Sequence, residues 1–176
     1  SYYDSPSNEE AISNKLMIDL LGQAKKYSYF YTPYLILNDP LKEAFIQAAQ
    51  RGIDVRIIIP GIPDKKLIYL LTKKYAQELV NKGVKVYVYK GGFIHAKAAI
   101  MDDKICSIGS VNLDYRSLYL HFENNTVFYE SSILKPLKED FLNVQNQSNI
   151  MPKKDKKDNI IKRILISIID LISPLC

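Results

Sequence analysis

Cysteine is scarce in this chain of 176 residues, which contains two, Cys106 and Cys176, the second at the last position. Two cysteines cannot form the disulfide framework on which small secreted domains depend. This cysteine content fits a reducing compartment or a protein that is indifferent to redox state. With 47% hydrophobic and 11% aromatic residues, the chain can form one domain with a core, which excludes disorder as its dominant state.

Long apolar runs are also absent. A helix that crosses a bilayer needs about 18 to 20 apolar residues, and the nearest approach, residues 160–172, is interrupted by Lys162, Arg163 and Asp170. The chain opens without an initiator Met, a basic segment or an apolar leader. We interpret the missing Met as a sign that the chain is part of a longer protein.

Acidic residues are fewer than basic ones. The chain has 24 Lys and Arg against 19 Asp and Glu, a formal net charge of +5. This excess favours anionic partners such as phospholipid, nucleic acid or phosphate esters.

The first half of the chain alternates between helix and strand patterns. Asp39 is expected to cap a helix that has Pro40 in its first turn and Gly52 just past its end. After Lys90 the pattern changes to successive strands, with a tight turn at residues 102–104. The expected helices are 8–26, 39–51, 64–82 and 132–144, and the expected strands are 27–31, 55–59, 84–89, 95–101, 105–108 and 122–130. The sequence therefore predicts an α/β fold, a mixed β-sheet flanked by helices.

One short motif carries the chemistry. His95 and Lys97 are two residues apart, so on a strand their side chains share a face, about 7 Å apart. A phosphoryl group fits between them, with Lys97 neutralising its oxygens while His95 attacks phosphorus or protonates a leaving oxygen. Ser110 and Asn112 follow the next strand and could add neutral donors to the same oxygens.

Two further observations complete the site. Glu123, at the head of the following strand, is placed to hold an imidazole in one tautomer. The sequence shows no Asp, Glu and His cluster spaced to bind a metal, and the chemistry needs no cofactor because Lys and amide donors stabilise the charge.

These residues carry a resemblance to a known family. The set His95, Lys97, Asp102, Gly109, Ser110, Asn112 and Glu123 resembles the second half-motif of the phospholipase D superfamily. The wider context is similar to the C-terminal half of the bacterial cardiolipin synthases, through Tyr3–Pro6, Thr32–Tyr34, Arg51–Arg56, Pro63–Lys65, Gly92–Lys97 and Asn112–Ser117.

The resemblance implies a reaction and a set of roles. Two phosphatidylglycerol molecules would give cardiolipin and glycerol through a phosphohistidine, with one histidine from each of two pseudo-symmetric half-domains. His95 would be the general acid and then base, Lys97 a phosphate ligand, and Asp102 a support of the motif's geometry. Many relatives have Asn where this chain has His121, so His121 is either a second polar contact or structural.

The expected partners follow from the half-site. They are phosphatidylglycerol or an anionic membrane surface, and either the missing N-terminal half-domain or a homodimer mate. Nucleic acid is a partner only under the alternative function, a homodimeric phosphodiesterase, nuclease or phospholipase D with a single motif. A third interpretation is a non-catalytic fragment that binds membranes.

The C-terminal segment is separate in character. We expect a catalytic half-domain over residues 1–147, a basic linker over 148–158 and an amphipathic helix over 159–176. Residues 151–176 contain six basic and three acidic residues, a net charge of +3. The helix either lies on a membrane surface as an anchor or docks on the protein's own core or a partner half. Under the first interpretation the chain is peripheral on the cytoplasmic side of the cell membrane.

Overall fold

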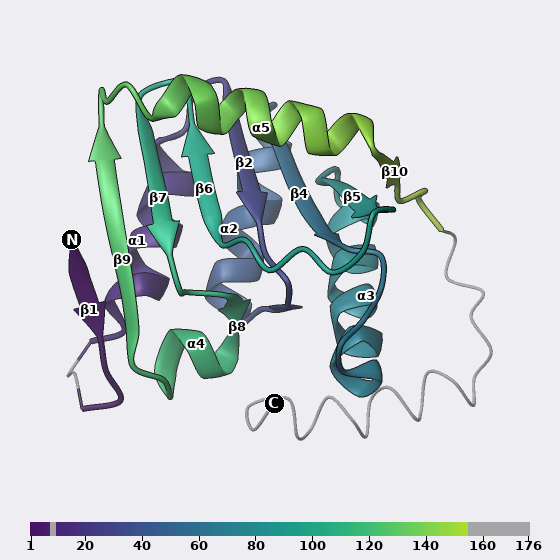
Figure 1. Cartoon of the computed structure of the whole chain (residues 1–176), viewed down its shortest axis with the longest axis horizontal. Coiled ribbons are helices and arrows are strands. Elements are labelled where there is room, and N and C mark those ends of the chain that lie inside the picture. The colour runs from purple at the N-terminus through teal and green to yellow at the C-terminus, as the bar shows by residue number, and fades with distance from the viewer. Residues whose placement is uncertain (8–9, 155–176) are drawn as a thin grey trace.

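The computed structural model describes residues 1–7 and 10–154, and within them the chain forms a mixed sheet flanked by helices, as the sequence predicts (Figure 1). The eight strands of the main sheet lie in the order β1-β9-β7-β6-β2-β4-β5-β10, and β3 and β8 pair separately. The strands are β1 (Tyr2–Asp4), β2 (Tyr27–Tyr31), β3 (Leu35–Ile36), β4 (Asp54–Pro60), β5 (Lys85–Tyr89), β6 (Ala98–Met101), β7 (Ile105–Gly109), β8 (Leu113–Asp114), β9 (Glu123–Tyr129) and β10 (Ser148–Ile150). The helices are α1 (Ile12–Gln23), α2 (Asp39–Gln50), α3 (Lys66–Asn81), α4 (Tyr115–Tyr119) and α5 (Leu134–Asn146).

The sheet has a parallel part and an antiparallel part. Strands β2, β4 and β5 are parallel, with Phe30 opposite Ile57 and Ile57 opposite Val86. Strand β6 pairs antiparallel with β2, and β7 and β9 continue in the same way. The change of pattern after Lys90 thus marks the point at which parallel strands with helical crossovers give way to antiparallel strands. A short turn joins β6 to β7, whereas β8 and α4 lie between β7 and β9.

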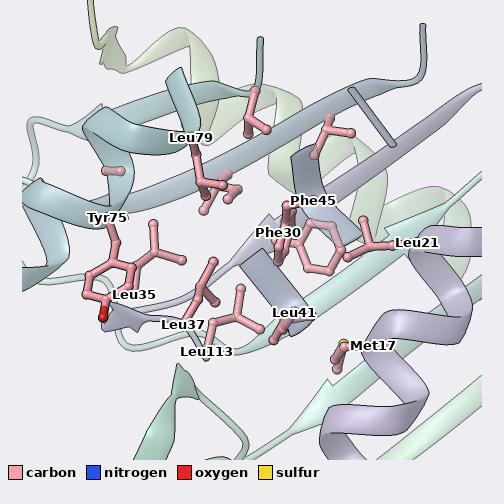
Figure 2. Close-up of a cluster of buried hydrophobic side chains, with 14 of the residues drawn as sticks. Met17, Leu21, Phe30, Leu35, Leu37, Leu41, Phe45, Tyr75, Leu79 and Leu113 are labelled. Carbon is pink, nitrogen blue, oxygen red and sulfur yellow. The ribbon is translucent and has the colours of Figure 1, made fainter. Parts of the chain in front are cut away.

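Each face of the sheet is covered by helix. Helices α1, α2 and α3 cover one face and α5 the other (Figure 1). On the first face Phe30 meets Phe45 of α2 with ring centroids 4.8 Å apart, next to Leu21 and Leu41 (Figure 2). On the second face Tyr29 stacks on Phe141 of α5 at 4.9 Å. Alternate residues of β2 therefore serve opposite cores, which explains why the whole strand is apolar or aromatic apart from one serine.

Helix α2 is capped one residue earlier than expected. Asn38, not Asp39, is the N-cap residue, and its side chain accepts a hydrogen bond of 2.8 Å from the backbone N–H of Leu41. Pro40 stands in the first turn and Gly52 follows the helix with φ of 86°, as predicted. Pro40, at the second position of the helix, has no N–H to donate, so the Asn38 side chain bonds to the third-position N–H of Leu41.

Two expected segments differ in the structure. Residues 148–150 of the expected linker form β10, which pairs antiparallel with β5 along the otherwise open edge of the sheet. The strand expected to start at His95 starts at Ala98. Its neighbours explain the late start. Because β2 ends at Tyr31 and β7 at Gly109, no described strand pairs with residues 95–97. The turn at Asp102 and Asp103 is present, with positive φ of 55° and 57°. The helix expected over 159–176 lies outside the described residues.

Candidate functional site

His95 and Lys97 lie in the segment that joins β5 to β6, immediately before β6 begins. The backbone N–H of Gly109 donates to the Lys97 carbonyl at 3.3 Å, which holds this segment against the end of β7. The Lys97 ammonium turns back and donates to the His95 carbonyl at 2.7 Å. The two side chains therefore share one short segment but not the face of a strand, so the strand rule that predicted their spacing does not apply here.

The His95 imidazole is exposed. Its ring centroid is 5.6 Å from that of Phe93, and within the described residues its nitrogens form no hydrogen bond or ion pair. The two ring nitrogens are thus free to accept or donate a proton to a bound molecule.

Lys97 is half-buried between this segment and two carboxylates. Burial lowers its pKa below the ordinary 10.5, while the charges of Glu123 and Asp114 act in the opposite direction. A half-buried ammonium facing two carboxylates is a site at which an anionic group of a substrate would gain electrostatic stabilisation.

Glu123 is buried at the start of β9 and makes the contacts that connect the site. The Ser110 hydroxyl donates to Glu123 Oε2 and accepts from the Asn124 N–H at 2.9 Å. Glu123 Oε1 lies 3.7 Å from Nδ1 of His121. The imidazole next to Glu123 within this chain is therefore that of His121 and not that of His95. His121 itself precedes the strand, since β9 begins at Glu123.

Asn112 and Asp114 lie in the segment between β7 and α4, next to this contact in the chain. The Asn112 amide donates to the Ser117 hydroxyl at 2.9 Å, and its Oδ1 is buried without a hydrogen-bond partner among the described residues. Asp114 caps α4 by accepting from the Ser117 N–H at 2.8 Å. Burial raises the pKa of Asp114, and the Ser117 N–H and the nearby His121 oppose that rise. The Ser110 hydroxyl and the Asn112 amide, which were expected to donate to a substrate, therefore donate to side chains of the protein, those of Glu123 and Ser117.

Asp102 lies away from this cluster, at the other end of β6 (Figure 1). Its carboxylate accepts from three consecutive backbone N–H groups, those of Lys25, Lys26 and Tyr27, at 2.7, 2.8 and 2.8 Å. These bonds tie the turn after β6 to the start of β2. Burial raises the Asp102 pKa, but the N–H bonds outweigh burial and hold it below the ordinary 3.8.

Three further residues hold the elements around the site together; Thr32 and Gly109 belong to the family resemblance, but the sequence interpretation gave none of the three a role. Buried Thr32 accepts from the Leu113 N–H at 3.1 Å and so joins the end of β2 to β8. A Cβ atom at Gly109 would lie 2.0 Å from Asn125 Oδ1, so only glycine lets β9 approach. Asn125 is itself buried and donates to Ser107 at 2.8 Å. The signal for each was a small or polar residue within or beside a buried strand.

An open pocket lies beside His121. It has a volume of about 240 Å³ and is lined by polar and apolar groups of the N-terminal segment and α4, among them Asp4, Glu10, Leu118 and Tyr119. Elsewhere, in residues 1–7 and 10–154, no three His, Cys, Asp or Glu side chains gather closely enough to hold a metal ion. No described helix is long and apolar enough to cross a membrane.

Comparison with known proteins places this geometry in a family. The family model described as "Cardiolipin synthase, PLD-like domain" matches residues 17–145. A cardiolipin synthase of Clostridium perfringens is 40% identical over 157 residues, which cover 89% of this chain and 33% of that protein. The chain spans about a third of the length of the curated relatives it matches.

Two solved structures share the fold at low identity. The phosphatidylserine synthase of Haemophilus influenzae superimposes with a TM-score of 0.78 and 17% identity, over 99% of this chain and 47% of that one. Nuc of Salmonella typhimurium, a phospholipase D family member, gives a TM-score of 0.71 and 19% identity, over 86% of this chain and 95% of that one. The chain thus matches about half of one protein and nearly all of the other.

Proposed function

This chain belongs to the cardiolipin synthase family of phospholipase D-like domains, and from that premise we propose that it supplies one of two half-sites for phosphatidyl transfer. The reaction joins two phosphatidylglycerol molecules to give cardiolipin and glycerol through a phosphohistidine. The observation that carries the proposal is an exposed imidazole with both nitrogens free, His95, on the same short segment as a half-buried ammonium, Lys97. No metal takes part in any step of this proposal.

The steps balance with two histidines. A histidine of the other half attacks phosphorus of the first phosphatidylglycerol, and His95 protonates the glycerol oxygen as its bond to phosphorus breaks. His95 then removes the proton from a hydroxyl of the second phosphatidylglycerol, which attacks the phosphohistidine and releases the first histidine. Lys97 stabilises the non-bridging oxygens throughout.

The second histidine must come from outside this fold unit. An in-line displacement needs its nucleophile and its acid on opposite sides of phosphorus, and His95 cannot be on both sides. His121 does not fit the role, because it lies against Glu123 and has no lysine two residues on. The 47% coverage of the phosphatidylserine synthase is consistent with a second half of similar size.

A second candidate function has its own support. The chain covers 95% of Nuc, so one unit of this size is nearly the whole of that family member. A homodimer of this chain would bring two His95 side chains together for phosphodiester hydrolysis, and the net charge of +5 would favour a polyanionic substrate.

The first test is replacement of His95 by alanine in a protein that contains both halves. We expect His95→Ala to lower phosphatidylglycerol turnover by about 10²- to 10⁴-fold, because the leaving glycerol oxygen loses its proton donor. His121→Asn is the matched variant and should cause a much smaller loss. Turnover of His95→Ala within a factor of about three of wild type would contradict the assignment.

The half-site is tested with the isolated chain. Phosphatidylglycerol transfer and phosphodiester hydrolysis are measured across a dilution series while light scattering follows the mass. The proposal expects activity only on mixing with the other half, whereas hydrolysis that falls with the dimer population supports the second candidate. Activity per chain that stays constant at concentrations where light scattering detects only monomer would contradict both candidate functions.

A further inference from the structure

The loop between β4 and α3 and the first two turns of α3 expose apolar and basic side chains together. Ile62, Leu67 and Leu70 are 58%, 45% and 39% exposed. Lys65, Lys66 and Lys73 are exposed among them. We call these six residues the α3 surface. Isolated apolar residues on a protein surface are ordinary, but three within nine residues, interleaved with lysines, form a patch that suits a partner.

The α3 surface is strongly one-sided in charge. Its three ammonium groups form no ion pair with any residue that the structure describes. After Asp64 the next acidic residue of the chain is Glu78, which lies on the far half of α3 and pairs with Lys74 and Lys42. The carboxylate of Asp64 is engaged by the Tyr34 hydroxyl and by the N–H of Lys65. The surface therefore presents apolar side chains among three lysines, with the single carboxylate of Asp64 at its edge, and so has a net positive charge.

The backbone that carries this surface is braced. The Tyr69 hydroxyl lies 3.0 Å and 3.1 Å from the carbonyl oxygens of Pro60 and Gly61, which fastens the loop to the helix. A Cβ atom at Gly61 would lie 2.1 Å from the Tyr89 carbonyl oxygen, so the loop also packs closely against the end of β5. Ile62 is therefore exposed on a loop whose backbone is fixed by these contacts.

The α3 surface lies beside the candidate site. Tyr34, which binds Asp64, has its ring centroid 6.3 Å from that of Phe93, and Phe93 lies 5.6 Å from His95. The start of α3 projects at the end of the sheet where β2 and β7 end and β6 begins (Figure 1). A partner bound to this surface would be close to His95.

We propose that the α3 surface docks the protein on an anionic lipid surface, with Ile62, Leu67 and Leu70 in the headgroup region and the three lysines beside lipid phosphates. Charge decides between the possible occupants. A second copy of this surface would be equally basic, and residues 151–176 of this chain carry a net charge of +3, so both are repelled. Anionic lipid is attracted, and each lysine near the membrane surface raises the binding constant about fivefold. The proposal goes beyond the transfer reaction and does not depend on it.

The test measures sedimentation of the full chain with two kinds of vesicle, phosphatidylcholine alone and phosphatidylcholine mixed equally with phosphatidylglycerol. We expect Leu67→Ser with Leu70→Ser to lower partitioning to the mixed vesicles at least about tenfold. Lys65→Gln, Lys66→Gln and Lys73→Gln together should lower it by about 100-fold on mixed vesicles and barely on neutral ones.

Matched variants at the opposite end of the sheet serve as controls. Tyr129 and Ile133 are 65% and 38% exposed, and Lys82, Lys104 and Lys135 are exposed lysines away from the α3 surface. Serine at the first pair or glutamine at the three lysines should leave partitioning within about twofold of wild type. Equal losses of vesicle partitioning in the control and the α3 variants would overturn the proposal. Unchanged vesicle binding of the α3 variants, together with a lower mass by light scattering, would also overturn it, because the α3 surface would then be an interface between copies of the chain. Because no step measures turnover, an incorrect transfer reaction would leave this result unaffected.

Discussion

Two residues of the matched motif, His95 and Asp102, have opposite surroundings. The His95 imidazole is exposed with both nitrogens free, whereas the Asp102 carboxylate accepts three backbone N–H groups at the far end of β6. Its bonds to the backbone hold the turn after β6 against the start of β2, at the end of β6 away from His95. That Asp102 maintains the geometry of the motif stays a prediction, which the stability of an Asp102 variant tests.

Asp102→Asn should lower the free energy of unfolding near neutral pH by about 1–3 kcal/mol, because the amide oxygen can replace only part of the bonds to the three N–H groups. Asparagine tolerates the φ of 55° at this position, so the backbone remains unstrained. Urea unfolding measures the loss, with Asp19→Asn, on an exposed face of α1, as the control. A loss no larger than that of the control would contradict the role.

The same residue predicts a pH dependence. The folded pKa of Asp102 lies below its ordinary 3.8, so its contribution is present above the unfolded pKa and is lost as the pH falls through the folded pKa. The difference between wild type and Asp102→Asn should therefore be constant from neutral pH to about 5 and shrink below about 4. A difference that grows as the pH falls would show that the carboxylate is destabilising.

At the scale of single elements, helix α2 shows what sets a helix end. Asn38 caps the helix and its amide also donates to Asn14 Oδ1 at 2.9 Å and to the Tyr119 hydroxyl at 2.5 Å. Asp39 is exposed, and among residues 1–7 and 10–154 its side chain bonds only to Lys42, at 2.9 Å. The cap thus joins α2 to α1 and to α4, beneath the candidate site.

Asn38→Ala should cost about 1–2 kcal/mol of stability, since it removes a cap and leaves its partners unpaired. Asp39→Ala, the neighbouring position that the sequence pattern favours as the cap, should cost less than about 0.5 kcal/mol because its ion pair is solvent-exposed. Thermal unfolding of the two variants distinguishes them. Equal losses would show that either residue can cap the helix.

At the scale of the whole molecule, the described chain continues past α5 along the edge of the sheet. The Met151 N–H donates to the Val86 carbonyl at 2.8 Å, and the Lys154 N–H to the Asn81 side chain at 3.2 Å. A deletion intended to remove only the basic segment and the expected helix must therefore start at residue 155.

Deletion of residues 155–176 tests the anchor. If this segment binds membranes, the shortened chain should keep its melting temperature, and its free energy of unfolding should change by less than about 0.5 kcal/mol. Compared with wild type, its sedimentation should fall much more with anionic vesicles than with neutral ones. Deletion from residue 148 is the control that removes β10 and should lower the melting temperature. A large fall in melting temperature on deletion from 155, with unchanged vesicle binding, would show that the segment docks on the core.

The order of the major elements and the residues of the motif could be predicted from the sequence alone. Strand β4 carries the buried apolar run Ile57–Ile59 because both faces of the sheet are covered there, and Gly52 and Gly83 end helices because they adopt positive φ. These are local consequences of chain chemistry, so periodicity and chain breakers reveal them.

The tertiary structure decided which polar groups meet. Whether Glu123 faces His121 or His95, and how far burial lowers the pKa of Lys97, depend on β9, β7 and the segment before β6, which are distant in sequence. Strand β10 likewise has no strong sequence pattern and forms because β5 offers an open edge. Such contacts arise from long-range packing, and a pattern within one segment carries no information about the segment that will lie opposite it.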